Sequence, residues 1–182
     1  MNGAAEGLQW FAMRAPFHKE MEAQKLLDKL CIENFIPMCH KVVVRRGKKH
    51  REWVPAVHNL VFVRTTHSLI QRVKRADIPF LQYVTRPEAG RNIPIIVPDV
   101  QMAQFMAVAR AEGEKLIYLT PDDLSHLGKG TRVRVLGGPF DGVEGIFLRV
   151  KGCRSRRVVL QIQGILAVAL AEIETDLIEV LD

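Results

Sequence analysis

A run of positive charge over residues 45–51 is the part of the sequence whose residue types most clearly suggest a chemistry. Gly47 lies in this run, no acidic residue does, and five of the seven residues are basic: Arg45, Arg46, Lys48, Lys49 and Arg51. Closely spaced cations of this kind neutralise nucleic-acid phosphates. Charged side chains also protect exposed strand edges from mispairing, but five cations without an acid exceed what that role requires. The run therefore predicts contact with a nucleic-acid backbone.

Charge is unevenly distributed along the 182 residues, whose formal net charge is +6. Residues 1–112 hold 17 Lys/Arg against 10 Asp/Glu, whereas residues 113–182 hold 9 against 10. The basic surface therefore belongs to the N-terminal part of the chain. Six further side chains on predicted helices are assigned to the same nucleic-acid surface: His18, Lys19, Lys25, Arg72, Lys74 and Arg75.

Residue combinations typical of enzymes or metal centres are missing from the sequence. The three serines have no nucleophile-elbow context, no phosphate-binding glycine loop is present, and spacing singles out no carboxylate pair. Cys39-His40, His50 and His58 lack the paired spacing of zinc ligands. We expect no catalytic residue, no metal site and no cofactor.

The cysteines and the N-terminus bear on the cellular compartment. Cys31, Cys39 and Cys153 are an odd number without framework spacing, which is typical of reduced thiols in a cytosol. The N-terminus contains Glu6 and no apolar run of the signal-peptide type. No segment approaches the ~20 apolar residues needed to span a bilayer. We expect a soluble, cytoplasmic monomer without a membrane partner.

Hydrophobic periodicity indicates the elements that position the basic side chains. Apolar residues at i, i+3, i+4 and i+7 predict helices over His18–Leu30 and after Asp99, and a short helix is expected over Ser68–Ala76. Strands are expected at Leu8–Met13, Phe35–Val44, Trp53–Val63 and Phe80–Thr85. The two middle strands flank the basic run, which places it at the tip of a long hairpin. This order fits an antiparallel sheet with helices on one face, close to the split βαβ arrangement.

A glycine-rich stretch, Lys129–Gly145, organises the C-terminal part. Val133 and Val135 alternate with arginines, which predicts a strand buried on one face. A Gly-Pro corner and the tight-turn pair Asp141-Gly142 end this strand and begin the next. Phe140 lies between the two turns, where it can plug the end of a small barrel. Further strands are expected at Ile146–Val150, Arg156–Gln163, Ile165–Ala171 and Leu177–Leu181.

Five short strands in about 55 residues are typical of an SH3-like barrel. The predicted fold class is therefore α+β, with an antiparallel sheet flanked by helices followed by an all-β SH3-like barrel. The predicted boundaries are residues 1–112 for the first domain, a polar and acidic linker at 113–127, and residues 128–182 for the barrel.

The corner resembles the KOW motif of NusG-type transcription factors and some ribosomal proteins, through Gly138, Pro139, Phe140, Gly142 and Gly145. The opening Trp10-Phe11, Ile32–Met38, the basic hairpin, Asn59–Val63 and the KOW segment follow the order of the NusG family. Within that family the chain looks most like the specialised UpxY-type antiterminators of capsule-polysaccharide operons. The stretches WVPAVHNLVFVR, KLIYL and IQGILAVALA carry that closer similarity.

The resemblance implies that residues 1–112 are an NGN domain that binds the clamp helices of RNA polymerase beside non-template DNA, with nascent RNA left open as a further partner. It implies a factor that suppresses pausing and termination on specific polysaccharide operons. Val57, His58 and Leu60 stand where the family has Phe, Pro and Tyr. The polymerase-binding residues that the resemblance implies are Phe35, Val57, His58, Leu60, Phe62 and Tyr83.

The KOW domain lacks two residues of the edge with which general NusG proteins hold the termination factor Rho or a ribosomal protein. Ile162–Ile165 stands where the family has Ile-Phe-Gly-Arg, so the Phe and the Arg are missing. The expected partner face, for an unknown partner, is Ile162, Gln163 and Ile165. Two alternatives stay open: a general NusG acting with Rho or the ribosome, and an RNA-binding KOW protein of ribosome assembly. The net charge of only +1 over residues 128–182 argues against the second.

Overall fold

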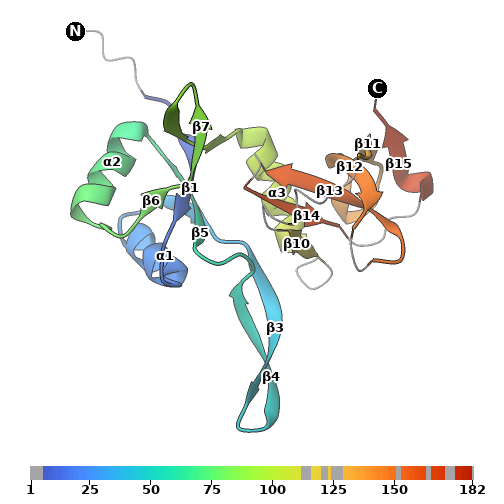
Figure 1. The fold of residues 1–182 in the computed structure, drawn as a ribbon, viewed down its shortest axis with the longest axis horizontal. Helices are drawn as coiled ribbons and strands as arrows, with labels where there is room; N and C mark the ends of the chain where they lie inside the picture. The colour runs from blue at the N-terminus through green and yellow to red at the C-terminus, as the bar shows by residue number, and fades with distance from the viewer. Residues whose placement is uncertain are drawn as a thin grey trace. The chain divides into compact units, whose positions relative to one another are not determined.

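The computed structural model describes residues 6–111, 116–119, 123, 129–150, 153–162, 165–170 and 175–181. The chain divides into two compact units. One holds residues up to Pro37 together with Pro55–Met102, and the other holds Met38–Val54 together with residues from Ala103 onward. The described residues form helices and antiparallel sheets joined by loops (Figure 1), which confirms the predicted α+β class.

The first unit contains an antiparallel sheet in which β5 and β1 are the central strands. Its path is β2-β5-β1-β6, and β9 also pairs with β1. The strands are β1 (Gln9–Arg14), β2 (Glu33–Phe35), β5 (Leu60–Thr65), β6 (Gln82–Tyr83) and β9 (Ile96–Val97). β1 and β5 are nearly continuous apolar runs whose side chains are buried on both faces. They form the core of this unit.

Three helices lie within the described residues: α1 (Glu20–Lys29), α2 (His67–Ala76) and α3 (Asp99–Ala111). α1 and α2 cover the same face of the sheet, as the sequence predicts (Figure 1). Asn34 of β2 donates to Asp28 of α1 at 2.7 Å, and the Lys74 ammonium of α2 lies 3.8 Å from the ring centre of Tyr83 in β6. The strand register places Asn34 and Tyr83 on one face of the sheet.

β3 (Met38–Arg45) and β4 (Lys48–Pro55) form a separate two-stranded sheet, the predicted hairpin. Arg46 and Gly47 form its turn with φ angles of 52° and 75°. Two consecutive left-handed residues make a type I′ turn, and glycine adopts the second position at little cost.

The strands predicted on either side of the hairpin turn are each interrupted, so the expectation of two unbroken strands was wrong. Pro37 separates β2 from β3, because proline cannot donate to a central ladder. Asn59, with a φ of 63°, separates β4 from β5. The strand predicted at Phe80–Thr85 is also shorter. It ends at β6, and β7 (Thr85–Glu88) and β8 (Arg91–Pro94) form a second small hairpin.

The C-terminal part forms a six-stranded antiparallel sheet in the order β10-β14-β13-β12-β11-β15. Its strands are β10 (Ile117–Leu119), β11 (Thr131–Val135), β12 (Glu144–Arg149), β13 (Arg156–Ile162), β14 (Leu166–Ala169) and β15 (Ile178–Val180), with 3-10 turns η1 (Gly138–Phe140) and η2 (Thr175–Leu177). All five strands predicted for the barrel are present. β10, from the segment predicted to be a linker, adds a sixth by pairing with β14.

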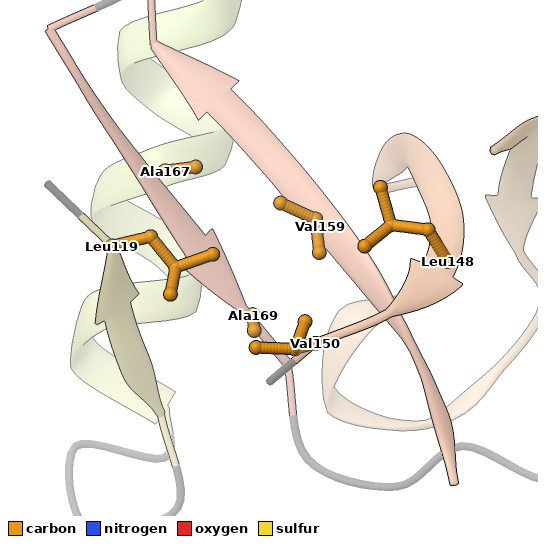
Figure 2. Packing of buried hydrophobic residues seen from close by; sticks show 6 residues of the cluster. All are labelled: Leu119, Leu148, Val150, Val159, Ala167 and Ala169. Carbon is orange, nitrogen blue, oxygen red and sulfur yellow. The ribbon is translucent and has the colours of Figure 1, made fainter. Parts of the chain in front are cut away.

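β10 also contributes to the hydrophobic core of this sheet. Leu119 of β10 packs with side chains of β12–β14 and the residue after β12 (Figure 2), the cluster being Leu119, Leu148, Val150, Val159, Ala167 and Ala169. Burying one leucine contributes about 1.5–3 kcal/mol. The strand is therefore held by packing as well as by its ladder.

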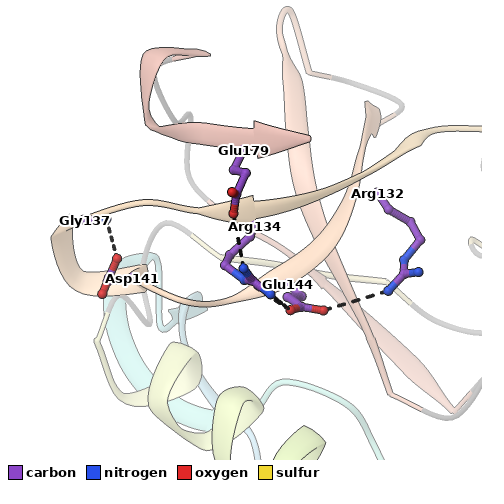
Figure 3. Close-up of polar contacts among 6 residues, drawn as sticks. All are labelled: Arg132, Arg134, Gly137, Asp141, Glu144 and Glu179. Carbon is purple, nitrogen blue, oxygen red and sulfur yellow. Dashed lines mark hydrogen bonds and ion pairs between the residues drawn. The ribbon is translucent and has the colours of Figure 1, made fainter. Parts of the chain in front are cut away.

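The glycine-rich corner is built as the sequence predicts. Asp141 accepts a hydrogen bond from the Gly137 N–H at 2.5 Å (Figure 3), and Phe140 is buried. A Cβ at Gly145 would lie 2.7 Å from the Val159 carbonyl oxygen, so only glycine fits there. Figure 3 also shows that Arg134 joins the three strands β12, β11 and β15, with ion pairs to Glu144 at 2.6 Å and Glu179 at 3.2 Å. These hydrogen bonds raise the pKa of Arg134.

Candidate functional site

The hairpin tip carries the basic side chains that the sequence assigned to nucleic acid. All of them are exposed: Arg45, Arg46, Lys48, Lys49 and Arg51. Arg45 pairs with Glu52 across the hairpin at 3.0 Å, so its charge is partly neutralised by an acid just outside the basic run. Among the described residues, no acid pairs with Arg46, Lys48 or Lys49. These three cations therefore remain available for phosphate groups.

The body of the hairpin exposes apolar side chains as well. Val42 and Val44 of β3 are 62% and 66% exposed, and Trp53 of β4 is 52% exposed. The Trp53 ring lies 4.6 Å from the ring of His40. Exposed aromatic and aliphatic groups beside a basic tip form a surface that suits a partner with both charged and apolar groups.

The residues predicted to bind polymerase do not form one surface. Phe35, Leu60 and Phe62 share one face of the first sheet, because Phe35 lies opposite Phe62 in the register. Tyr83 lies opposite Met13 and so on the other face, against α2. Leu60 is 4% exposed and Phe62 is fully buried, so both act in the core of this structure. Their contact with a partner stays a prediction.

Val57 and His58 lie in the loop between β4 and β5, where Val57 is partly exposed and His58 is exposed. The loop adjoins the one between β1 and α1. The His18 N–H donates to Asn59 Oδ1 at 3.0 Å, and the Ala15 N–H donates to the Asn59 carbonyl at 2.9 Å. Two loops far apart in sequence therefore form one surface.

Phe17 is an exposed residue of this surface that the sequence reading did not assign. Its side chain is 87% exposed, the largest exposure among the large apolar side chains described, and its φ is 61°. A bulky residue with positive φ is uncommon. The signal that could have identified it is an aromatic residue between Pro16 and His18, in a loop with no apolar periodicity. We call Phe17, His18, Val57 and His58 the loop surface.

A buried acid lies beneath the loop surface. Glu20 is 1% exposed, and its carboxylate accepts a hydrogen bond from the Asn59 N–H. His58 Nδ1 lies 3.9 Å from Glu20 Oε1, and the His18 and His58 rings meet edge to face at 4.6 Å. The acid thus fixes the turn at Asn59 and stands next to both imidazoles.

The basic residues predicted on the helices differ in accessibility. Lys25, Arg72 and Arg75 are exposed. Lys19 lies 4.7 Å from the centre of the Phe80 ring and pairs with Glu22 at 3.5 Å. Lys74 lies over Tyr83, where burial lowers its pKa, and burial raises the pKa of Tyr83. Lys19 and Lys74 are therefore already engaged with other groups in this structure.

The predicted partner face of the barrel is largely internal. Ile162 and Ile165 are buried, and the Ile165 N–H donates to the Ile162 carbonyl at 2.8 Å. Gln163 lies outside the described residues. The role of these residues in binding a partner stays a prediction.

Comparison with known proteins gives three findings. The family model described as "Transcription termination factor nusG" matches residues 8–106. None of the curated proteins matches the chain. A solved structure titled "Domain interaction in Thermotoga maritima NusG" matches 96% of this chain and 98% of that chain, at 16% sequence identity and a TM-score of 0.48. No helix among the described residues is long and apolar enough to cross a membrane.

Proposed function

Because the chain belongs to the NusG family, whose members act on transcription elongation and termination, we propose that it binds RNA polymerase and non-template DNA and suppresses pausing and termination. The observation that carries this proposal is the hairpin tip within the matched region. It presents Arg46, Lys48 and Lys49 without an acidic partner among the described residues. The proposed role is that of a binding factor and not of an enzyme.

The proposed polymerase contact is the loop surface. Phe17 offers a large exposed ring, and Val57 adds an aliphatic side chain in the adjoining loop. Buried aromatic anchors at the centre of an interface contribute most of its binding energy. The surface lies within the family match and includes two residues of the stretch that resembles the family's clamp-helix pocket.

The proposed targets are polysaccharide operons, as in the specialised branch that the sequence resembles. The support is the similarity over Trp53–Arg64 and Ile162–Ala171. The missing Phe and Arg at the barrel edge fit a factor that does not recruit Rho or a ribosomal protein in the usual way. Titration of the full chain with purified Rho tests this point, and binding as tight as that of a general NusG protein would contradict it.

The nucleic-acid contact is tested with an elongation complex that contains a non-template strand. Replacing Arg46, Lys48 and Lys49 together with alanine should weaken binding and flatten its dependence on salt. Each lost phosphate contact removes about 0.7–0.9 from the slope of log affinity against log salt, so the triple variant should lose roughly 2–3. Folding should be unaffected, because all three side chains are exposed.

A matched control removes the same charge from the C-terminal sheet. Arg149, Arg154 and Arg156 are exposed there, and their replacement with alanine should leave the salt slope unchanged. If the control variant lost affinity and the hairpin variant did not, the alternative of an RNA-binding KOW protein would be favoured instead.

The polymerase contact is tested separately with Phe17→Ser. We expect a loss of at least about tenfold in affinity for polymerase without nucleic acid, or about 1.4 kcal/mol. Val100→Ser is the control, since Val100 is also strongly exposed, at the start of α3. Equal affinity of wild type and the Phe17 variant would show that the loop surface is not the contact.

A further inference from the structure

Among the described residues, Glu20 is the only charged side chain that the fold buries. A buried carboxylate is costly unless hydrogen bonds or positive charge compensate it. Its carboxylate accepts a hydrogen bond from one backbone N–H, that of Asn59, and no Lys or Arg among the described residues lies within ion-pair distance of it. Two imidazoles stand beside it instead. We propose that His18, Glu20 and His58 bind a divalent transition-metal ion, with Zn²⁺ as the expected occupant.

The potential ligand atoms are already gathered. One nitrogen from each histidine and one carboxylate oxygen of Glu20 lie within 4.8 Å of one another. Ligands of a tetrahedral zinc ion at about 2.0–2.2 Å lie roughly 3.3–3.5 Å apart. Closing the widest of these separations by roughly 1.5 Å therefore completes the site. Both imidazoles are exposed and can rotate, whereas Glu20 is held in place.

The fold holds the three residues together before any ion arrives. Hydrogen bonds from His18 and Ala15 to Asn59 tie the two loops to each other, and Asn59 in turn donates to Glu20. His18 and Asn59 both have positive φ angles, of 56° and 63°. Such angles persist only where the surroundings fix them. The conformational entropy of the ligand residues is therefore lost largely when the chain folds, and little of it remains to be lost when the ion binds.

The donor set selects the class of ion. Two imidazoles and a carboxylate suit zinc and its neighbours, with one position left for water. Magnesium and calcium prefer oxygen ligands and would find only one residue of that kind here. Sequence spacing could not indicate this site, since His58 follows Glu20 by 38 residues and the fold alone brings them together. The inference is independent of the proposed function.

Calorimetric titration of the tag-free, chelator-treated full chain with Zn²⁺ tests the site. We expect saturable binding of one ion, weakened more than tenfold in His18→Ala and in His58→Ala. Loss of an outer-shell partner costs about 10–100-fold in metal affinity, and loss of a ligand should cost at least as much. His50→Ala is the matched control, because His50 is exposed on β4 outside the cluster, and it should bind like wild type.

Absorption of the Co²⁺-loaded chain identifies the ligands independently of affinity. Nitrogen and oxygen ligands give visible d–d bands without the near-ultraviolet charge transfer of a thiolate, and these bands should disappear in His58→Ala. A thiolate band would assign the ion to a cysteine and overturn the proposal. So would unchanged Zn²⁺ affinity in both histidine variants, or no saturable binding by wild type, in which case Glu20 serves only to fix the turn at Asn59.

Discussion

The hairpin β3–β4 and the C-terminal sheet are made from the same local pattern, and the fold uses it in opposite ways. Lys41–Arg45 reads KVVVR and Arg132–Val135 reads RVRV, so both are short valine-rich runs with basic residues beside the valines, a composition that favours strands. Val42 and Val44 are 62% and 66% exposed, whereas Val133 and Val135 are 1% and 2% exposed. Only Val133 and Val135 have a hydrophobic core to pack against.

This difference separates a strand that stabilises the fold from a strand that presents a surface. In the C-terminal sheet, each neighbour adds a ladder and a layer of apolar side chains, so its valines are buried. A two-stranded ribbon is marginally stable and buries little of either face. Its exposed valines and cations are therefore available for a partner. Substitutions in the two regions should affect different properties.

The largest effect is expected from a cavity in the C-terminal sheet. Leu148→Ala removes a buried side chain from the cluster of Figure 2 and should cost about 2–5 kcal/mol of the free energy of unfolding. Val44→Ala in the hairpin should change it by less than about 0.5 kcal/mol. Urea denaturation of the two variants measures the contrast. A large cost in the Val44 variant would mean that the hairpin is packed in solution.

A second contrast uses two glycines. Gly145→Ala would place a methyl group 2.7 Å from the Val159 carbonyl oxygen and 2.8 Å from a Val158 methyl, and should cost about 1–3 kcal/mol. A Cβ at Gly47 meets nothing within 4 Å, so Gly47→Ala incurs only the left-handed backbone cost, roughly 1 kcal/mol. In thermal unfolding, Gly145→Ala should have a lower melting temperature than Gly47→Ala. The reverse order would contradict the close packing of β12 on β13.

Local patterns sufficed to predict much of this fold. The helices over Glu20–Lys29 and His67–Ala76 follow from apolar periodicity, and the barrel strands follow from alternation and turn residues. The local patterns did not show where the chain passes from one sheet to another. Ile36-Pro37 connects β2 to β3, which belong to different sheets, but the apolar residues around it read as one continuous strand. β10 was missed because three apolar residues in a polar segment become a strand only by pairing with β14.

The candidate site was predicted less well, because the burial of a side chain and the face of the sheet on which it lies depend on residues distant in the sequence. Phe62 and Tyr83 were grouped, yet the register places them on opposite faces of the sheet. Phe17 belongs to no periodic pattern, and its exposure depends on how two loops meet. The basic tip was found, since a run of cations is local. Its partner Glu52 lay one residue beyond that run.

Alkaline pH should weaken the C-terminal sheet through Tyr118. Burial raises the pKa of this tyrosine to about 12, against about 10 in an unfolded chain. A raised pKa means that the folded state holds its proton more tightly, so this contribution is complete below pH 10 and is lost as the pH rises from 10 to 12. We expect a loss of about 1–2 kcal/mol. Tyr118→Phe should abolish it.

Tyr83 is a poorer probe of the same effect, although burial raises its pKa too. The Lys74 ammonium above its ring has a lowered pKa, so deprotonation of Lys74 favours the folded state as the pH rises. The two contributions oppose each other. Urea denaturation at about pH 9 and pH 11.5 should show a larger loss of stability in wild type than in Tyr118→Phe. Equal pH dependence of wild type and Tyr118→Phe would show that Tyr118 is solvated.

The smallest effect on stability is expected from Glu52→Gln. Glu52 is the only acid in the hairpin, and it pairs with Arg45, whose side chain is 71% exposed. Exposed ion pairs contribute about 0.2–1 kcal/mol, so the free energy of unfolding should fall by roughly 0.5 kcal/mol or less.

Binding of Glu52→Gln to nucleic acid should become tighter while stability falls slightly. The substitution frees Arg45 and removes a negative charge close to the tip, so the salt slope should steepen by up to about 0.9, the value for one added phosphate contact. Glu88→Gln is the control, since Glu88 pairs with Arg86 at 3.3 Å in the other small hairpin. If both variants changed the slope equally, the effect would come from net charge alone. A change in Glu52→Gln only would mean that the hairpin cations bind the partner and do little for the fold.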